Sequence, residues 1–252
     1  MDDLAEDTPA RIYLQPIASP NVLGLYALGA SVFVYGAWMA GWYGSEGSPG
    51  LMFPFLALFG GLAQFLAGMW AFRARDSLAA IVFTAAGSFW LAYGLLHLTS
   101  VLSEAVAIPP GGFSELGFWL IPLAVIAAVA TAAATARSIV LTVTFGAFAL
   151  SVAVLAIGQL TGSDPVLAIS GWLLVISGLI AAYTASALLL ADAMDRELLP
   201  LVTTSGMGRV DRGLGEPGVV HGDWVSDGIA HQERRRSEPQ WEFQWPVRRR
   251  AA

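Results

Sequence analysis

The sequence predicts an all-α integral membrane protein, a six-transmembrane-helix bundle with both termini in the cytoplasm. Hydrophobic residues make up 56% of its 252 residues and charged residues 13%, about half the charged share of a typical soluble domain. The mean hydropathy is +0.64. Six stretches approach the length of about 20 apolar residues that a helix needs to cross a bilayer. These observations exclude an ordinary soluble domain.

Composition divides the chain into three zones. Residues 1–20 are polar and acidic, residues 21–191 are almost wholly apolar, and residues 192–252 are rich in Gly, Pro, Arg and Glu. We expect the last zone to be a disordered cytoplasmic tail, because it has few aliphatic side chains to bury. Breaks in the apolar zone separate six expected spans, at about 23–43, 51–72, 78–102, 116–136, 138–160 and 166–191.

Each break between spans has a local cause. Residues 44–50 read GSEGSPG and residues 161–165 read TGSDP, both typical of turns. Residues 73–76 read RARD, and residues 108–112 read IPPGG, where proline cannot continue a helix. The break at Arg137 depends on one charge between two apolar runs. Transmembrane strands would alternate apolar and polar residues, and these continuous apolar runs favour helices instead.

The arginines predict the topology. Basic residues gather in cytoplasmic loops of membrane proteins. Arginines occur after the second, fourth and sixth expected spans, whereas the other connections carry only acidic residues. This alternation predicts that both termini lie in the cytoplasm. The arginines are Arg73, Arg75, Arg137 and Arg196, and the acids are Glu46, Glu104, Glu115 and Asp164.

Small residues recur on single faces of the expected helices. Pairs of glycines lie seven residues apart, which is about two helical turns. Such faces allow close backbone contact between membrane helices, and they also leave room for a solute. We expect packing to be the main role of each glycine. The pairs are Gly29 and Gly36, Gly61 and Gly68, Gly87 and Gly94, and Gly171 and Gly178.

No ionisable residue lies at the middle of a span, which argues against a pump with a buried carboxylate relay. His97, near the end of the third span, is interpreted mainly as an interfacial residue and secondarily as a proton site. No catalytic motif, metal-ligand spacing or ATPase motif is present. We therefore expect no enzyme activity, no metal and no cofactor. The net charge of −6 argues against a nucleic-acid partner.

Uncharged polar residues inside the spans are the candidate groups of a solute path. A primary amide is costly in hydrocarbon without a partner. The two glutamines should therefore bond to neighbouring helices or offer hydrogen bonds to a small polar solute, and both interpretations stay open. The candidate polar residues are Ser31, Gln64, Ser88 and Gln159.

Short motifs in order along the apolar zone resemble the acetate uptake transporter family of bacterial succinate–acetate permeases and fungal acetate transporters. Residues 59–98 carry GGxxQxxAG followed by GSFW, and residues 19–25 read SPNVLGL, similar to the family signature NPAPLGL. The resemblance covers about residues 19–195. The residues that carry it are Ser19, Pro20, Leu23, Gly24, Gly60, Gly61, Gly68, Gly87, Phe89 and Trp90.

The resemblance implies a six-helix subunit with its own pore, assembled as a hexamer, that moves acetate and similar small monocarboxylates. Some members also move succinate, and proton coupling is commonly proposed. The family's apolar constriction maps to Leu28, Ala86 and Phe148. The chain departs from the family where an aromatic residue becomes Ala86, which either widens the constriction or leaves closure to Leu28 and Phe148.

Two further function classes stay open from the sequence. One is a channel for a neutral small polar solute such as urea, because the spans contain no buried charge. The other is a membrane sensor or scaffold that transports nothing and signals through its tail. In each case the lipid bilayer, most simply a bacterial cytoplasmic membrane, is the expected environment.

Overall fold

The computed structural model describes residues 18–45, 48–103, 108, 113–194, 196 and 198–201, whose regular elements are all helices. Within these residues, six helical segments are long and apolar enough to cross a membrane. The predicted fold class, a six-helix membrane protein, is confirmed. Most of the expected N-terminal segment, and the expected tail beyond residue 201, lie outside the described residues.

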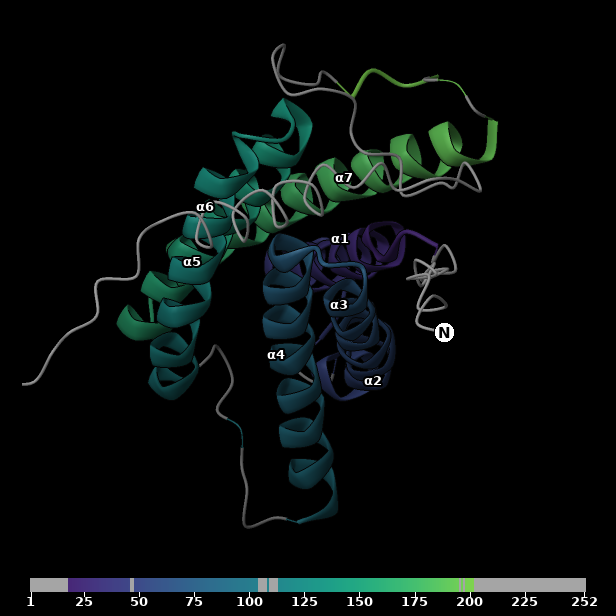
Figure 1. The fold of residues 1–252 in the computed structure, drawn as a ribbon. Helices are drawn as coiled ribbons and strands as arrows, with labels where there is room; N and C mark the ends of the chain where they lie inside the picture. The colour runs from purple at the N-terminus through teal and green to yellow at the C-terminus, as the bar shows by residue number, and fades with distance from the viewer. Residues whose placement is uncertain are drawn as a thin grey trace, which may run out of the picture. The chain divides into compact units, whose positions relative to one another are not determined.

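Eight elements follow one another along the described chain, coloured from purple to green in Figure 1. They are α1 (Pro20–Met39), α2 (Ser48–Phe55), η1 (Leu56–Ala63), α3 (Gln64–Arg73), α4 (Ser77–Leu102), α5 (Ser114–Ala134), α6 (Ile139–Thr161) and α7 (Asp164–Met194). The second span consists of α2, η1 and α3 in one continuous run, and every other helix is a span by itself.

Local sequence sets both ends of α1. Pro20 is its first residue, where a missing N–H leaves no helical bond unmade. Gly41 adopts a φ of 75° and the Trp42 N–H donates back into the last turn at 2.9 Å. This backbone pattern ends many helices at a glycine. The helix therefore stops at Met39, four residues before the end of the expected span.

The second span changes its helical type midway. Pro54 lies inside α2 and supplies no N–H to the helical ladder. Two residues later the chain enters η1, a π-helical stretch with a wider turn, which runs to Ala63. Such stretches are rare and frequently occur at functional sites. Gln64 is the first residue after it.

Glycines hold α1 against α7, and Figure 1 shows the two helices close together. A Cβ added at Gly29 would lie 2.9 Å from the Gly178 carbonyl oxygen, and one at Gly36 would lie 2.7 Å from that of Gly171. A Cβ at Gly178 or Gly171 would meet the opposite carbonyl oxygen at 2.7 and 2.8 Å. The predicted packing role of these two glycine pairs is confirmed.

The second span packs on α4 by the same means. A Cβ at Gly87 would lie 2.6 Å from the Phe65 backbone nitrogen, and one at Gly68 would lie 2.7 Å from that of Thr84. α5 packs on α6, and α6 packs on α7. Close backbone contact at small residues is the usual basis of helix association in lipid, where apolar side chains gain little by leaving the solvent.

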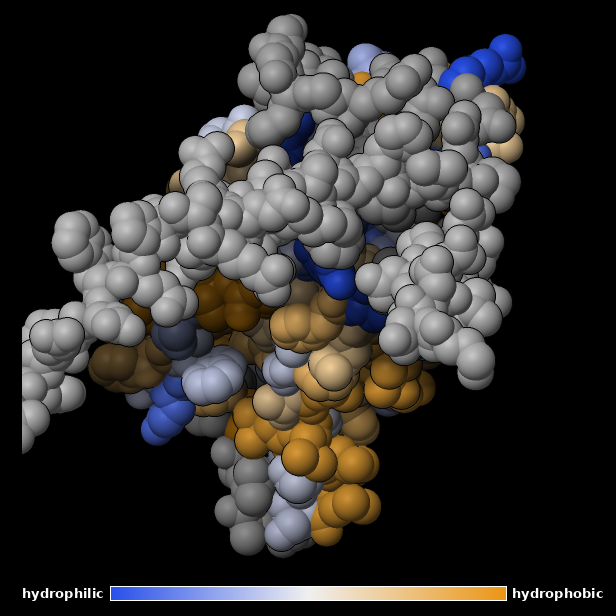
Figure 2. Space-filling model, in the orientation of Figure 1, coloured by the Kyte–Doolittle hydropathy of each residue, from blue (hydrophilic) through white to orange (hydrophobic). Residues whose placement is uncertain are grey.

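Large apolar side chains cover the outside of the bundle. Figure 2 shows them over the region of α2 to α4. Leu51 is 77% exposed and Phe55 is 74% exposed. Patches of this kind are unusual on a soluble monomer, and hydrocarbon is the environment that suits them. Further exposed apolar residues are Leu58, Leu95, Phe118, Val129 and Leu179.

A polar cluster joins three elements at one end of the bundle. Arg137, between α5 and α6, contacts the Asp76 carboxylate at 2.7 Å. Asp76 caps α4 by accepting from the Ala79 N–H at 3.1 Å, and it accepts from the Asn21 amide at 3.1 Å. Burial opposes ionisation of Asp76, but these three donors outweigh it and hold the pKa of the carboxyl below its usual value.

Gly171→Ala should destabilise the bundle by about 1–3 kcal/mol, the usual cost of overpacking. Its new methyl group would lie 2.5 Å from the Ala40 backbone nitrogen, which cannot move aside as a side chain can. Gly50→Ala is the matched control, because no atom lies within 4 Å of that Cβ position. Thermal unfolding of both variants in detergent measures the difference, and equal melting temperatures would contradict the packing account.

Asp76→Ala should lower stability by about 1 kcal/mol at pH 7, because it removes a helix cap. The folded pKa of Asp76 is depressed, so its stabilisation is complete above the unfolded pKa of about 3.9 and is lost as pH falls through the folded pKa. Melting curves of wild type and variant should therefore differ equally at pH 7 and pH 5, and converge only below about 3.9. Melting curves of wild type and variant that already coincide at pH 5 would contradict the depressed pKa of Asp76.

Candidate solute path

The Gln64 amide is fully buried, and neither its oxygen nor its nitrogen has a hydrogen-bond partner. Leaving such a group unpaired costs about 1–3 kcal/mol, so it is rare in folded proteins. Gln64 lies about one turn after Gly60, whose missing side chain makes room for Ser31 of α1 and the Trp90 ring of α4. The amide is thus held inside the bundle, with a donor and an acceptor free for a solute.

Hydroxyl groups near this region bond mostly to their own helices. The Ser31 Oγ donates to the Ala27 carbonyl oxygen at 2.7 Å, and the Ser88 Oγ donates to that of Thr84 at 2.7 Å. Each hydroxyl keeps lone pairs that can still accept a hydrogen bond. Two further buried hydroxyl groups in the described residues, those of Thr84 and Ser177, have no partner. Unpaired buried polar groups thus occur on α3, α4 and α7 of the described residues.

Gln159, the other candidate amide, has a bond to the backbone. Its Oε1 accepts from the Phe113 N–H at 3.0 Å, and its side chain is 5% exposed. The bond joins the last turns of α6 to the residue that precedes α5. Gln159 thus contributes to a helix connection near the end of a span, whereas Gln64 lies well inside one.

The three residues of the expected apolar constriction lie in one buried apolar cluster, which leaves their role as a constriction a prediction. Leu28, Ala86 and Phe148 are at most 3% exposed, and all three belong to one apolar cluster. Ala86 and Phe148 line a small cavity of about 20 Å³, together with Phe89 and Trp90. That volume is close to what one water molecule needs. The apolar segment around this cavity is therefore nearly closed. Trp90 in its lining also adjoins Gly60, which contacts Ser31 and lies about one turn before Gln64.

The remaining signature residues lie at helix ends and helix contacts. Ser19 precedes Pro20 at the start of α1, and Leu23 is 44% exposed on the outside of the same helix. The signature glycines leave no room for a methyl group, because each is in contact with a neighbouring helix. The contacts are Gly24 with Phe83, Gly61 with Leu91, Gly68 with Thr84, and Gly87 with Phe65.

His97 lies further along α4 and is also buried. Its Nδ1 is 3.0 Å from the Tyr93 carbonyl oxygen, so Nδ1 must carry the proton and Nε2 is left as the acceptor of the neutral ring. The ring centroid is 4.2 Å from that of Tyr93. The residue is therefore packed among aromatic rings, and its proton role stays a prediction.

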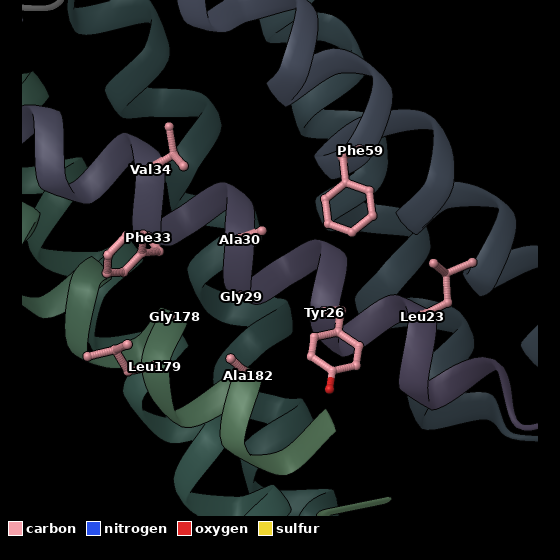
Figure 3. A pocket seen from close by; sticks show the side chains of 10 residues that line it. All are labelled: Leu23, Tyr26, Gly29, Ala30, Phe33, Val34, Phe59, Gly178, Leu179 and Ala182. Atoms are coloured by element: carbon pink, nitrogen blue, oxygen red, sulfur yellow. The ribbon is translucent and has the colours of Figure 1, made fainter. Parts of the chain in front are cut away.

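A larger hollow of about 440 Å³ lies elsewhere, between α1, η1 and α7 (Figure 3). Its walls are apolar, with Phe33 and Phe59 on two of these elements and Leu179 on the third. The one hydroxyl in its lining, on Tyr26, contacts the Ser186 Oγ at 2.8 Å. This hollow offers no free polar group to a carboxylate, so it is a poor candidate for the solute path.

Sequence reasoning did not single out two features. Tyr35 lines the same small cavity as Ala86, and the Asp76–Arg137 pair joins two connections. The first had a signal in the sequence, because Tyr35 lies seven residues after Leu28 and so on the same helical face. The second had none, because sequence spacing does not predict which connections meet.

The chain belongs to the GPR1/FUN34/yaaH family, whose model matches residues 5–197. It is 27% identical over 185 residues to the succinate-acetate/proton symporter SatP of Escherichia coli K12, covering 73% of this chain and 95% of that protein. The SatP of Shigella flexneri matches with the same identity and coverage. The family resemblance inferred from the sequence is thereby confirmed.

A solved structure extends the comparison to the fold. The bacterial acetate channel SatP superposes with a TM-score of 0.67 at 26% sequence identity, and the match covers 73% of this chain and 99% of that one. These relatives are transport proteins of membranes, not enzymes. The chain is accordingly an integral membrane protein of a transporter family.

Gln64→Leu should raise or preserve thermal stability, because it removes an unpaired buried amide that costs about 1–3 kcal/mol. It should also lower solute uptake several-fold, because the path loses its free donor and acceptor. Gln159→Leu is the matched control. It leaves the Phe113 N–H without its acceptor, so it should lower stability by about 1 kcal/mol and leave uptake per folded protein nearly unchanged. A Gln64→Leu protein that melts lower and transports normally would contradict the assignment.

Proposed function

We propose that this protein moves acetate and similar small monocarboxylates across the membrane, along a path inside the bundle of a single chain. The observation that carries the proposal is the buried, unpaired amide of Gln64. About one turn earlier, Gly60 adjoins Ser31 and Trp90, and Trp90 belongs to the same apolar cluster as Leu28, Ala86 and Phe148. The family membership and the SatP relatives support the same solute class. Succinate is a further candidate, because the symporter's name includes it.

The chemistry of the path favours the undissociated acid as the species that crosses its apolar segment. A bare carboxylate loses its hydration there and finds no arginine to compensate, because the charged side chains of the described spans lie near their ends. The neutral acid carries one O–H donor and a carbonyl acceptor. These match the oxygen and the nitrogen of the Gln64 amide, so the site holds the acid while its methyl group enters the apolar segment.

Proton coupling follows because the species that crosses the apolar segment is the undissociated acid. Each undissociated acid that crosses and then ionises delivers one proton with one carboxylate, so net proton–acetate cotransport needs no separate proton site. One SatP relative is named a symporter and another an acetate channel. Both descriptions are compatible with a path whose apolar segment passes the acid without a driven conformational cycle.

We also propose that both ends of the chain lie in the cytoplasm of a bacterial cell. The Asp76–Arg137 contact and the Asn21–Asp76 bond support one shared end for two arginine-bearing connections and the start of α1. The Ser138 Oγ donates to the Leu201 carbonyl oxygen at 2.9 Å, which supports the same end for the chain after α7. Arginines favour the cytoplasmic side. The homo-hexamer is carried over from the family resemblance.

Purified protein in proteoliposomes should take up labelled acetate faster than empty liposomes, and propionate should compete. At fixed total acetate, uptake should fall as pH rises, because the undissociated fraction decreases about tenfold per pH unit above the acid's pKa. The measurement is initial uptake between pH 5 and pH 8, with the empty-liposome leak subtracted. Uptake that follows the acetate anion and is constant over this range would contradict the neutral-acid path.

The same vesicles distinguish the other function classes. Flux of urea that exceeds flux of acetate would favour a channel for neutral amides. Acetate binding without flux of either solute, from protein shown to be folded, would favour a sensor.

A further inference from the structure

Three aromatic rings from two helices pack edge to face inside the bundle. The Tyr35 ring of α1 lies 5.6 Å from Trp90 and 5.5 Å from Tyr93 of α4, and the two α4 rings are 5.8 Å apart, between centroids. Their interplanar angles are 70–85° and the three side chains are 2–6% exposed. This geometry is favourable for aromatic pairs and leaves little freedom for any one ring to turn.

The two tyrosines have the same offset from the apolar segment. Tyr35 follows Leu28 by seven residues and Tyr93 follows Ala86 by seven, which is two turns or about 10 Å along each helix. α1 and α4 run in the same direction, because Asn21 at the start of one bonds to the cap residue Asp76 of the other. The tyrosine pair therefore lies directly beyond the apolar segment, toward the ends of both helices.

Two of these rings, Tyr35 and Trp90, line the small cavity, and Tyr93 packs against both of them. Its lining also includes Ala86 and Phe148. The methyl group of Ala86 is too small to fill the space, and the volume left is only about 20 Å³. A solute at Ala86 must therefore displace the ring contacts to move on toward the ends of α1 and α4.

We propose that Tyr35 and Tyr93 form an aromatic constriction that sets the size limit of the transported acid. The inference rests on the proposed function of the path. The rings close the way beyond Ala86, and the two phenol hydroxyl groups, which bond to each other, can exchange that bond for one to the carboxyl group as it passes, because each can donate and accept. A short acid needs a small ring displacement, whereas a longer or bulkier acid needs both tyrosines to move.

The chain contains no cysteine, so one introduced thiol reports access to the cavity. In lipid nanodiscs, the thiol of Ala86→Cys should react slowly with methyl methanethiosulfonate, as followed by intact-protein mass. Adding Tyr35→Ala and Tyr93→Ala should raise the rate at least tenfold. Adding Tyr35→Phe and Tyr93→Phe should leave it slow, because the rings remain.

Tyr26→Ala with Tyr183→Ala is the matched control, because neither side chain lines the small cavity and their hydroxyl groups bond instead to the Ser186 Oγ and the Pro200 carbonyl oxygen. This control pair should leave the reaction of the introduced thiol slow. If the alanine pair does not fold, as judged by size-exclusion chromatography, Tyr35→Leu with Tyr93→Leu keeps apolar volume without planar rings and should also accelerate the reaction. Equal rates in the tyrosine background and in whichever ring-less background folds would overturn the proposal.

Uptake completes the test. Without the rings, the rate of butyrate relative to acetate should rise several-fold. Absence of acetate uptake by the wild type would contradict the proposed function but not the thiol result, which needs no transport. Accelerated thiol reaction with an unchanged butyrate-to-acetate ratio would overturn the size-limit role.

Discussion

Backbone contact at glycines is the interaction on which the rest of this bundle depends. Hydrocarbon gives apolar helices little reason to associate, so packing must come from surfaces that fit at close range. Gly29 and Gly36 meet Gly178 and Gly171 across α1 and α7, with carbonyl oxygens where side chains would be. The second span meets α4 in the same way. This packing fixes the positions of the polar side chains that lie between the helices.

Tight packing around an unpaired amide is an arrangement that stability alone does not explain. Gly60 leaves space for Ser31 and Trp90, and about one turn later Gln64 is buried without a partner. The π-helical stretch just before Gln64 changes the helical register at this point. A structural role would have paired the amide, as Gln159 is paired with the Phe113 N–H. The free donor and acceptor, next to an apolar segment, instead suit a solute that is both polar and small.

Hydrophobic length, glycine periodicity and composition were sufficient to predict much of this structure. Apolar length predicted the six spans, and glycine spacing predicted close packing at the faces of α1 and α7, because both depend on local helix geometry; that these two helices meet each other came only from the structure. The π-helix had no sequence signal apart from Pro54, and the partners of Asp76 come from distant segments. The backbone conformation of Arg75 was also not predictable from the sequence. Its φ is 58°, a left-handed conformation that glycine adopts more easily.

Anomalous diffraction from crystals soaked in bromoacetate would test most directly whether the carboxylate path lies within one chain. The protein has no cysteine thiol for this reagent to alkylate. A carboxylate path within one chain should give a bromine peak inside a single bundle, near Ala86, with the carboxyl group beside the Gln64 amide. Bromine found only in the apolar hollow between α1, η1 and α7, or only between neighbouring chains, would contradict it.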